Sequence, residues 1–156
     1  MPDIEYDNFL KITLFKLDQG FRRLDADERE NGKKEFADLI GEHSSENDIR
    51  TYSTVGIRAD AELMLVQDSP SVDTFHELSK CINQSLMGRY LDQAYSYLSI
   101  RRKSRYQHGG GAPKLKEDYK YMVIYPMTKT RPWYEKTMKE RQEMMNDHFR
   151  VGKNYP

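Results

Sequence analysis

The sequence has one cysteine, no net charge and no long apolar run. Cys81 is the single cysteine among 156 residues, which excludes an internal disulfide, a cysteine-based zinc site and an iron–sulfur cluster. The 25 basic residues balance 25 acidic ones, so the electrostatic footprint of a nucleic-acid-binding protein is missing. No apolar stretch reaches the about 20 residues that a membrane helix needs, and the first residues do not form a signal sequence. We therefore expect a cytoplasmic protein with no nucleic-acid or membrane partner.

Aromatic residues compensate for a modest apolar content. Hydrophobic residues account for 37% of the sequence and charged residues for 32%, whereas 11 Tyr, 6 Phe and 1 Trp supply large side chains for a core. The apolar residues lie in periodic segments, which argues against a disordered chain. The length predicts one ordinary domain or two small ones.

The first hundred residues predict the element order β-α-β-β-α-β. Leu10, Ile12 and Leu14 recur at every second position, which is the period of a strand. Asp25 is a typical residue before the first turn of a helix, and Pro70 is typical of the first turn itself. The expected strands are residues 9–17, 49–57, 61–67 and 95–100, and the expected helices are residues 25–40, ended by Gly41, and 69–87, ended by Gly88.

This order is that of the ferredoxin-like fold, so we expect an α+β protein whose first domain spans residues 1–101. Four antiparallel strands would form one sheet, with two helices covering one of its faces. The apolar stripe of Phe75, Leu78, Ile82 and Leu86 is typical of a half-buried helix. The opposite face, carrying tyrosine and leucine, needs a cover, and a second sheet is the usual one.

The rest of the chain predicts a linker and the beginning of a second domain. Residues 102–117 contain a basic run and a glycine-rich stretch that cannot hold regular structure. A strand over residues 119–125 and a helix over residues 133–149 would follow, within a second ferredoxin-like domain over residues 118–156. A strand and a helix cannot close a sheet by themselves. Either a partner chain completes it or the sequence lacks its C-terminal half, and we favour the second.

The last predicted helix carries a histidine at the end of a methionine-lined stripe. Met138, Arg141, Met145 and His148 are spaced so that they share one helical face. From spacing alone, such a histidine is more often a core-edge residue, bonded to a carbonyl or stabilised by the helix dipole. The alternative is a metal or haem ligand, because neutral imidazole is the commonest such ligand. The other histidines have no second ligand at metal spacing: His43, His76 and His108.

Tyr125 and Lys129 lie at the predicted end of the second domain's strand, which Pro126 terminates. Taken alone, they are more simply a strand-end tyrosine and a solvated lysine. The functional alternative is a redox-active phenol beside an ammonium that pairs with an anion, because ligands tend to bind where strands end. Similarly, the basic run from Arg101 to Arg105 is either a solvated joint or a partner for ligand carboxylates.

The chain from Tyr125 to Tyr155 carries a specific set of motifs. Its parts are Tyr-Pro-Met-Thr-Lys at 125–129, Trp133-Tyr134, Met138-x-x-Arg141 and Met-Met-Asn-Asp-His-Phe-Arg-Val-Gly-Lys-x-Tyr at 144–155. Together they resemble the chlorite dismutase family, and within it most closely the coproheme decarboxylase branch. Residues 52–60 and the element order around them resemble the N-terminal domain of the same family, so the resemblance spans nearly the whole chain.

The resemblance implies roles for individual residues. His148 would be the proximal ligand of the haem iron, which makes the haem-ligand interpretation the favoured one. Tyr125 would form the radical that abstracts hydrogen from a propionate. Lys129 would pair with a propionate, and Met127 would contact the same group. A propionate-binding arginine of the family would correspond to Arg102 or Arg105.

The resemblance also implies a function in haem biosynthesis. The expected reaction is the peroxide-dependent oxidative decarboxylation of coproheme III to haem b in two steps. The expected partners are an iron porphyrin and hydrogen peroxide, and the ring-forming relatives imply a homo-oligomer, for which we expect a pentamer. One alternative is a chlorite-degrading or peroxidase-like haem enzyme, which would need a distal arginine and would not need Tyr125. The other is a cofactor-free ferredoxin-like assembly protein.

Overall fold

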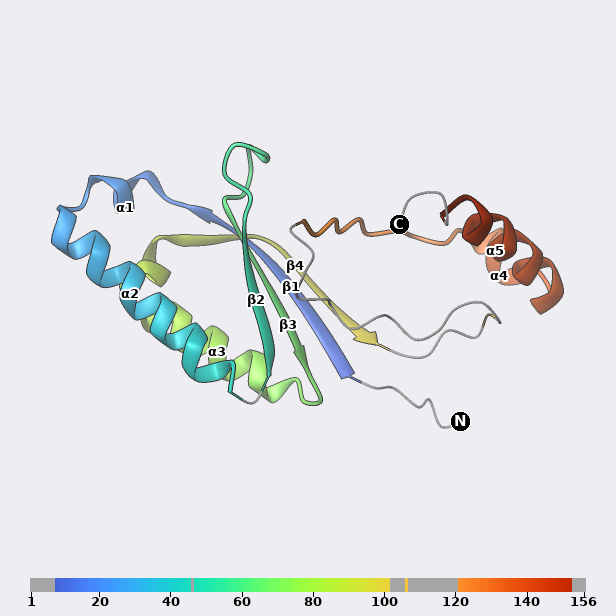
Figure 1. Cartoon of the computed structure of the whole chain (residues 1–156), viewed down its shortest axis with the longest axis horizontal. Coiled ribbons are helices and arrows are strands. Elements are labelled where there is room, and N and C mark those ends of the chain that lie inside the picture. Colours follow the sequence, from blue (N-terminus) through green and yellow to red (C-terminus); the bar gives the residue numbers. More distant parts are fainter. Residues whose placement is uncertain (1–7, 46, 102–105, 107–120, 153–156) are drawn as a thin grey trace. The chain divides into compact units, whose positions relative to one another are not determined.

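The computed structural model describes residues 8–45, 47–101, 106 and 121–152 (Figure 1). The chain divides into two units, Met1–Arg101 and Arg102–Pro156. Most of the predicted linker and the first two residues of the predicted second-domain strand lie outside the described residues.

The first unit contains one four-stranded antiparallel sheet with the strand order β2-β3-β1-β4. Its strands are β1 (Asn8–Leu17), β2 (Asp48–Ser53), β3 (Leu63–Ser69) and β4 (Leu91–Arg101). The helices between them are α2 (Ala26–His43) and α3 (Asp73–Gln84), so the predicted ferredoxin-like order is confirmed. The short helix α1 (Gln19–Arg23) and the 3₁₀-helix η1 (Met87–Tyr90) are additions that we did not predict.

Helices α2 and α3 cover one face of this sheet (Figure 1). Phe15 of β1 and Leu65 of β3 pack there against Phe36 of α2 and against Leu78 and Ile82 of α3. All five side chains are buried. Three of the four residues of the predicted apolar stripe are therefore buried, whereas the fourth, Leu86, lies beyond the end of α3. The alternation of β1 determines which of its side chains reach the helices.

The other face of the sheet presents a pair of tyrosines. Leu14 is paired with Tyr95 and Ile12 with Tyr97 in the β1–β4 register, so these side chains alternate with Phe15 and point away from the helices. The two tyrosine rings stack with centroids 6.3 Å apart and planes 7° apart. Both tyrosines are partly exposed, whereas Ile12 and Leu14 are buried.

The predicted strand over residues 49–57 is wrong beyond Ser53. The backbone N–H groups of Ile57 and Arg58 both donate to the carbonyl of Thr54, at 3.0 and 3.1 Å, which closes a turn. Gly56 has a φ of 75° within it, a conformation that favours glycine. The connection to β3 is therefore an ordered loop that is longer than the three residues, 58–60, left between the two predicted strands.

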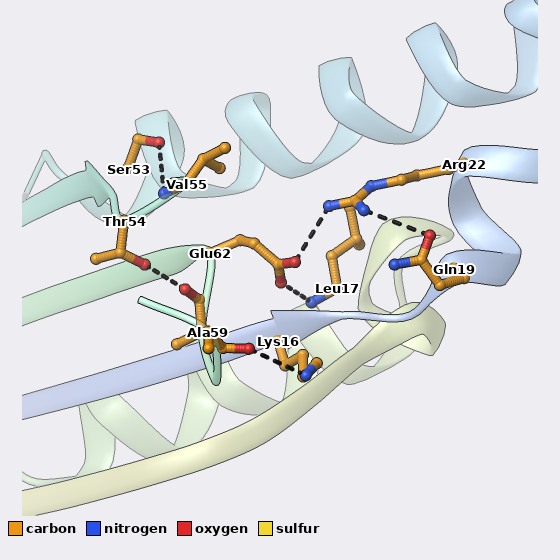
Figure 2. A network of polar contacts seen from close by, with 10 residues as sticks. Lys16, Leu17, Gln19, Arg22, Ser53, Thr54, Val55, Ala59 and Glu62 are labelled. Carbon is orange, nitrogen blue, oxygen red and sulfur yellow. Dashed lines mark hydrogen bonds and ion pairs between the residues drawn. The ribbon is translucent and has the colours of Figure 1, made fainter. Parts of the chain in front are cut away.

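This loop is held against the end of β1 and against α1 (Figure 2). The carboxylate of Glu62 accepts hydrogen bonds from the backbone N–H of Leu17 at 2.8 Å and from the guanidinium of Arg22 at 3.1 Å. The ammonium of Lys16 donates to the carbonyl of Ala59 at 3.2 Å. These contacts fix the loop at two points.

The predicted helix starts and ends are partly confirmed. The Asp25 side chain accepts from the backbone N–H of Glu28 at 2.8 Å, as expected for the residue that caps α2. Helix α2 nevertheless continues past Gly41 to His43, because Gly41 does not adopt the left-handed conformation that ends helices. Helix α3 begins at Asp73 rather than at Ser69, which still belongs to β3. It ends at Gln84, before Gly88.

Two glycines in this unit give a matched prediction about stability. Gly41 lies inside α2, and a Cβ added there would meet nothing within 4 Å. Gly41→Ala should therefore stabilise the protein by about 0.5–1 kcal/mol, the difference in helix propensity between the two residues. A Cβ on Gly88 would lie 1.7 Å from the carbonyl oxygen of Ile82, so Gly88→Ala should destabilise by about 1–3 kcal/mol. Urea unfolding of both variants measures the two effects, and equal effects of the same sign would contradict the packing described.

Candidate functional site

All four predicted site residues lie in the second unit. Tyr125, Met127 and Lys129 precede the short helix α4 (Arg131–Glu135), and His148 lies on helix α5 (Met138–Gly152). Tyr125 and Met127 are 64% and 67% exposed, so both can be reached from solvent. Within the part of the chain that the structure describes, no hydrogen bond joins His148 to the other three.

The strand predicted over residues 119–125 is wrong over its described part, residues 121–125. A strand is defined by its ladder, and these residues pair with no strand in the described part of the chain. Exposure nevertheless alternates along this segment: Tyr121, Val123 and Tyr125 are exposed, whereas Met122 and Ile124 are half-buried. Tyr125 therefore lies on the same side of this segment as two other exposed apolar residues.

The ammonium of Lys129 lies over an aromatic ring. Its Nζ is 3.9 Å from the centroid of the Trp133 ring, well within the range of a cation–π contact. The first turn of α4 places the ring there, because the backbone N–H of Trp133 donates to the carbonyl of Thr130 at 3.0 Å. Lys129 remains exposed, so its charge is available to an anion on the side away from the indole. The sequence contained the pair at a spacing of four, but nothing in the spacing marked it as a contact.

The helix predicted over residues 133–149 is two helices, α4 and α5. Thr137 begins the second one through a reciprocal capping box with Glu140. The Glu140 carboxylate accepts from the backbone N–H and from the hydroxyl of Thr137, both at 2.7 Å, and the backbone N–H of Glu140 donates to the Thr137 hydroxyl at 3.3 Å. The hydrogen bond from the Thr137 side chain is the main cause that holds the pKa of Glu140 below its ordinary value. The Thr-x-x-Glu signature of a capping box is visible in the sequence at residues 137–140, where it marks a helix start that we did not predict.

His148 is exposed and lies among apolar side chains of α5. Met144 precedes it by four residues and Val151 follows it by three, so both flank it on the helix surface. They are 48% and 52% exposed. The ring of Phe149 stands edge-on to the imidazole, with centroids 6.0 Å apart and planes at 61°. An exposed imidazole within an apolar surface differs from the core-edge histidine that spacing alone favours.

Arg141 adds to the same helix a donor that has no partner in the described part of the chain. It lies two turns before His148, on the helical face predicted from the spacing. Its Nε is buried and has no hydrogen-bond partner among the described residues. A buried donor without a partner is unfavourable, so a carboxylate supplied from elsewhere would stabilise it. The sequence placed Arg141 on this face but did not show that the group is orphaned.

The basic run at the end of β4 has one described member, and its role is structural. Arg101 forms an ion pair with Asp68 at 2.7 Å, and both side chains are largely buried. Asn8 donates to the other oxygen of Asp68 at 2.5 Å, so the group joins three strands. Arg102 and Arg105, the candidate propionate-binding residues, lie outside the described residues.

The remaining described histidines lie in the first unit. His43 bonds through Nδ1 to the carbonyl of Leu39 at 2.9 Å, and His76 is exposed on α3. No three histidine, cysteine or acidic side chains gather into a metal site among the residues with described positions. None of the described helices is long and apolar enough to cross a membrane.

The chain belongs to the chlorite dismutase family. The family model for chlorite dismutase matches residues 29–156, which covers most of the first unit and all of the second. The match extends over every residue singled out in the second unit, so the resemblance inferred from the motifs is confirmed at the level of the family.

Solved structures show the same fold. A chlorite dismutase from Candidatus Nitrospira defluvii (R173A mutant) is 17% identical, with a TM-score of 0.82 over 97% of this chain and 67% of that one. The same protein in complex with imidazole is 16% identical, with a TM-score of 0.81 and the same shares. A novel heme-binding protein from Thermus thermophilus is 19% identical, with a TM-score of 0.70 over 97% of this chain and 68% of that one. The chain thus spans about two thirds of the length of these structures.

The capping box predicts a specific loss of helix stability. Thr137→Ala removes the hydroxyl that bonds Glu140, so α5 should lose about 1 kcal/mol of stability, measured by far-ultraviolet circular dichroism during thermal unfolding. Thr130→Ala is the matched control. Thr130 precedes α4 and makes no side-chain cap hydrogen bond, so removing its hydroxyl should lower the stability of the helix less.

The same box predicts the direction of a pH effect. The folded-state pKa of Glu140 is lowered, so its contribution is present above the unfolded-state pKa and is lost as the pH falls through the folded-state pKa. The Thr137→Ala variant should show less of this acid-dependent loss. A helix signal that responds to acid identically in parent and variant would be incompatible with the box.

Proposed function

We propose that this chain binds an iron porphyrin and acts as a peroxide-dependent coproheme decarboxylase that produces haem b. The observation that carries the proposal is His148, an exposed imidazole flanked by Met144 and Val151 on α5. Two findings support it: membership of the chlorite dismutase family and the fold shared with a heme-binding protein of Thermus thermophilus.

The residues present fit such a group. The imidazole of His148 supplies a nitrogen ligand of the kind that haem iron takes, and its apolar neighbours suit the porphyrin plane. The ammonium of Lys129 is a donor suited to a propionate carboxylate. The bound iron porphyrin would supply the oxidising chemistry when peroxide is present.

Tyr125 is the residue proposed to carry out the proton and electron transfer. Its side chain is 64% exposed at the end of an apolar segment, so its hydroxyl can meet a bound substrate. A phenol can give up a proton and an electron together and then take a hydrogen atom from the carbon chain of a propionate. Each propionic acid side chain and one peroxide would yield one vinyl group, one carbon dioxide and two water molecules.

Lys129 and Met127 are proposed to position the substrate. The Trp133 ring restricts the Lys129 ammonium to one side, which favours a defined position for a paired carboxylate. Met127 lies two residues from both Tyr125 and Lys129, so its flexible, exposed side chain can contact the same group. Neither residue carries out the redox step in this assignment.

The runner-up function is chlorite or peroxide turnover without decarboxylation. It is favoured by the structural matches to the chlorite dismutase of Candidatus Nitrospira defluvii. Mass spectrometry of coproheme after peroxide addition separates the two, because only a decarboxylase removes carbon dioxide from the porphyrin.

We also propose a homo-oligomer, of which a pentamer is the expected form. The exposed Leu98 and Ile100 of strand β4 support association.

Removing the imidazole tests haem binding. His148→Ala should abolish the Soret band that forms when haem is added to the parent protein at micromolar concentration. His43→Ala and His76→Ala are the controls and should leave the band unchanged. Added imidazole should restore the band in His148→Gly. An unchanged spectrum in the His148 variants would reject the assignment.

Tyr125→Phe separates binding from chemistry, because it keeps the ring and removes only the hydroxyl. The variant should bind coproheme within about 1 kcal/mol of the parent, the contribution of one neutral hydrogen bond. It should form no vinyl group when peroxide is added, as measured by mass spectrometry. Lys129→Ala should instead weaken binding, because an ammonium positions a carboxylate without redox chemistry. Production of haem b by Tyr125→Phe at the parental rate would favour the peroxidase alternative.

A further inference from the structure

The first unit contains a groove that the proposed haem site does not use. It lies between helix α2 and the sheet and has a volume of about 480 Å³. This volume falls within the range of small-molecule sites, about 300–1,000 Å³. Apolar residues of α2, β3 and η1 form most of its wall: Phe36, Ala37, Ile40, Leu63 and Met87.

The groove follows one face of α2. Lys33, Ala37 and Gly41 recur at every fourth residue, and Phe36 and Ile40 lie beside that row, so the lining residues of α2 form a band along the helix. From Lys33 to Gly41 the helix rises about 12 Å, at 1.5 Å per residue. The site is therefore elongated, and its shape suits a chain rather than a broad ring.

The floor of the groove is part of the hydrophobic core, and one end is open. Phe36 is 7% exposed and belongs to the core, whereas Ile40, Leu63 and Met87 are only partly buried and pack against it. Gly41 lines the groove and is exposed, and a Cβ there would meet nothing within 4 Å, so the groove is open at this end. Covering such partly exposed apolar surface with an apolar ligand lowers the free energy of the complex.

A single cation lies at the other end. Lys33 lines the groove, and its ammonium pairs with Glu30 at 2.7 Å. Both side chains are more than half exposed, and exposed pairs of this kind contribute little. Because the existing pair is weak, the ammonium can turn to an acidic group bound in the groove.

We propose that this groove binds a medium-chain fatty acid, with the alkyl chain along the lining of α2 from Phe36 to Gly41 and the carboxylate near Lys33. An apolar channel with one terminal ammonium is complementary to a chain with one terminal negative charge. A neutral alkane lacks the group that Lys33 can pair with.

The test uses decanoate, below its micelle concentration, with the full chain and no haem added. Carbon-13 labelling of the methionine methyl groups reports binding, and the resonance of Met87 is assigned with Met87→Leu. The Met87 methyl should shift in a saturable way. Octanoate should bind about tenfold more weakly, since it buries two fewer methylene groups.

Variants separate the two ends of the groove. Gly41→Leu fills the open space and should weaken decanoate binding at least tenfold, whereas Asp38→Leu adds the same side chain at an exposed position outside the lining and should not. Lys33→Gln should weaken decanoate binding about threefold, the scale of an exposed ion pair, and should leave decan-1-ol binding unchanged. Lys34→Gln, on the neighbouring position, controls for net charge.

The outcomes are distinguishable from those of the haem assignment, because none of the measurements needs a porphyrin. A Met87 methyl that does not move during the titration would overturn the proposal. So would parental affinity in Gly41→Leu, provided that circular dichroism shows the variant folded. Equal losses of decanoate and decan-1-ol in Lys33→Gln would leave an apolar groove without carboxylate recognition and would also overturn it.

Discussion

The pairing of β1 between β3 and β4 is the constraint on which the first unit depends. It directs Phe15 toward the helices and Leu14 toward the opposite face, and a slip of one residue would exchange the two sets. The buried ion pair between Asp68 and Arg101, together with the hydrogen bond from Asn8, fixes the same three strands at one end. The wall of the α2 groove and the tyrosine pair on the other face both follow from this register.

The second unit is organised by local interactions. The Thr137–Glu140 capping box begins α5, and the contact between Lys129 and Trp133 holds a cation at the start of α4. The cap determines where α5 begins, and the helical period then places Met144 and Val151 beside His148. An exposed imidazole, an ammonium held over an indole and an exposed phenol therefore arise from two short segments of chain.

The sequence was informative where a period or a motif carried the information. The alternation of β1 and the stripe on α3 predicted their elements, and the motif from Tyr125 to Tyr155 predicted the family. It was less informative about ends, since Gly41 does not end α2 and the strand after residue 48 stops at Ser53. Helix and strand propensities do not specify where an element ends, because tertiary contacts and turn geometry determine its last residue.

Side-chain contacts of the site were likewise beyond the sequence. Nothing in the spacing showed that Trp133 lies beneath Lys129 or that the buried Nε of Arg141 has no partner among the described residues. The most direct test of iron ligation by His148 is resonance Raman spectroscopy of the ferrous haem complex made with nitrogen-15 histidine. An iron–nitrogen stretching band should move to lower frequency with the label and vanish in His148→Gly. A band that is unaffected by the label, or that persists in the variant, would contradict it.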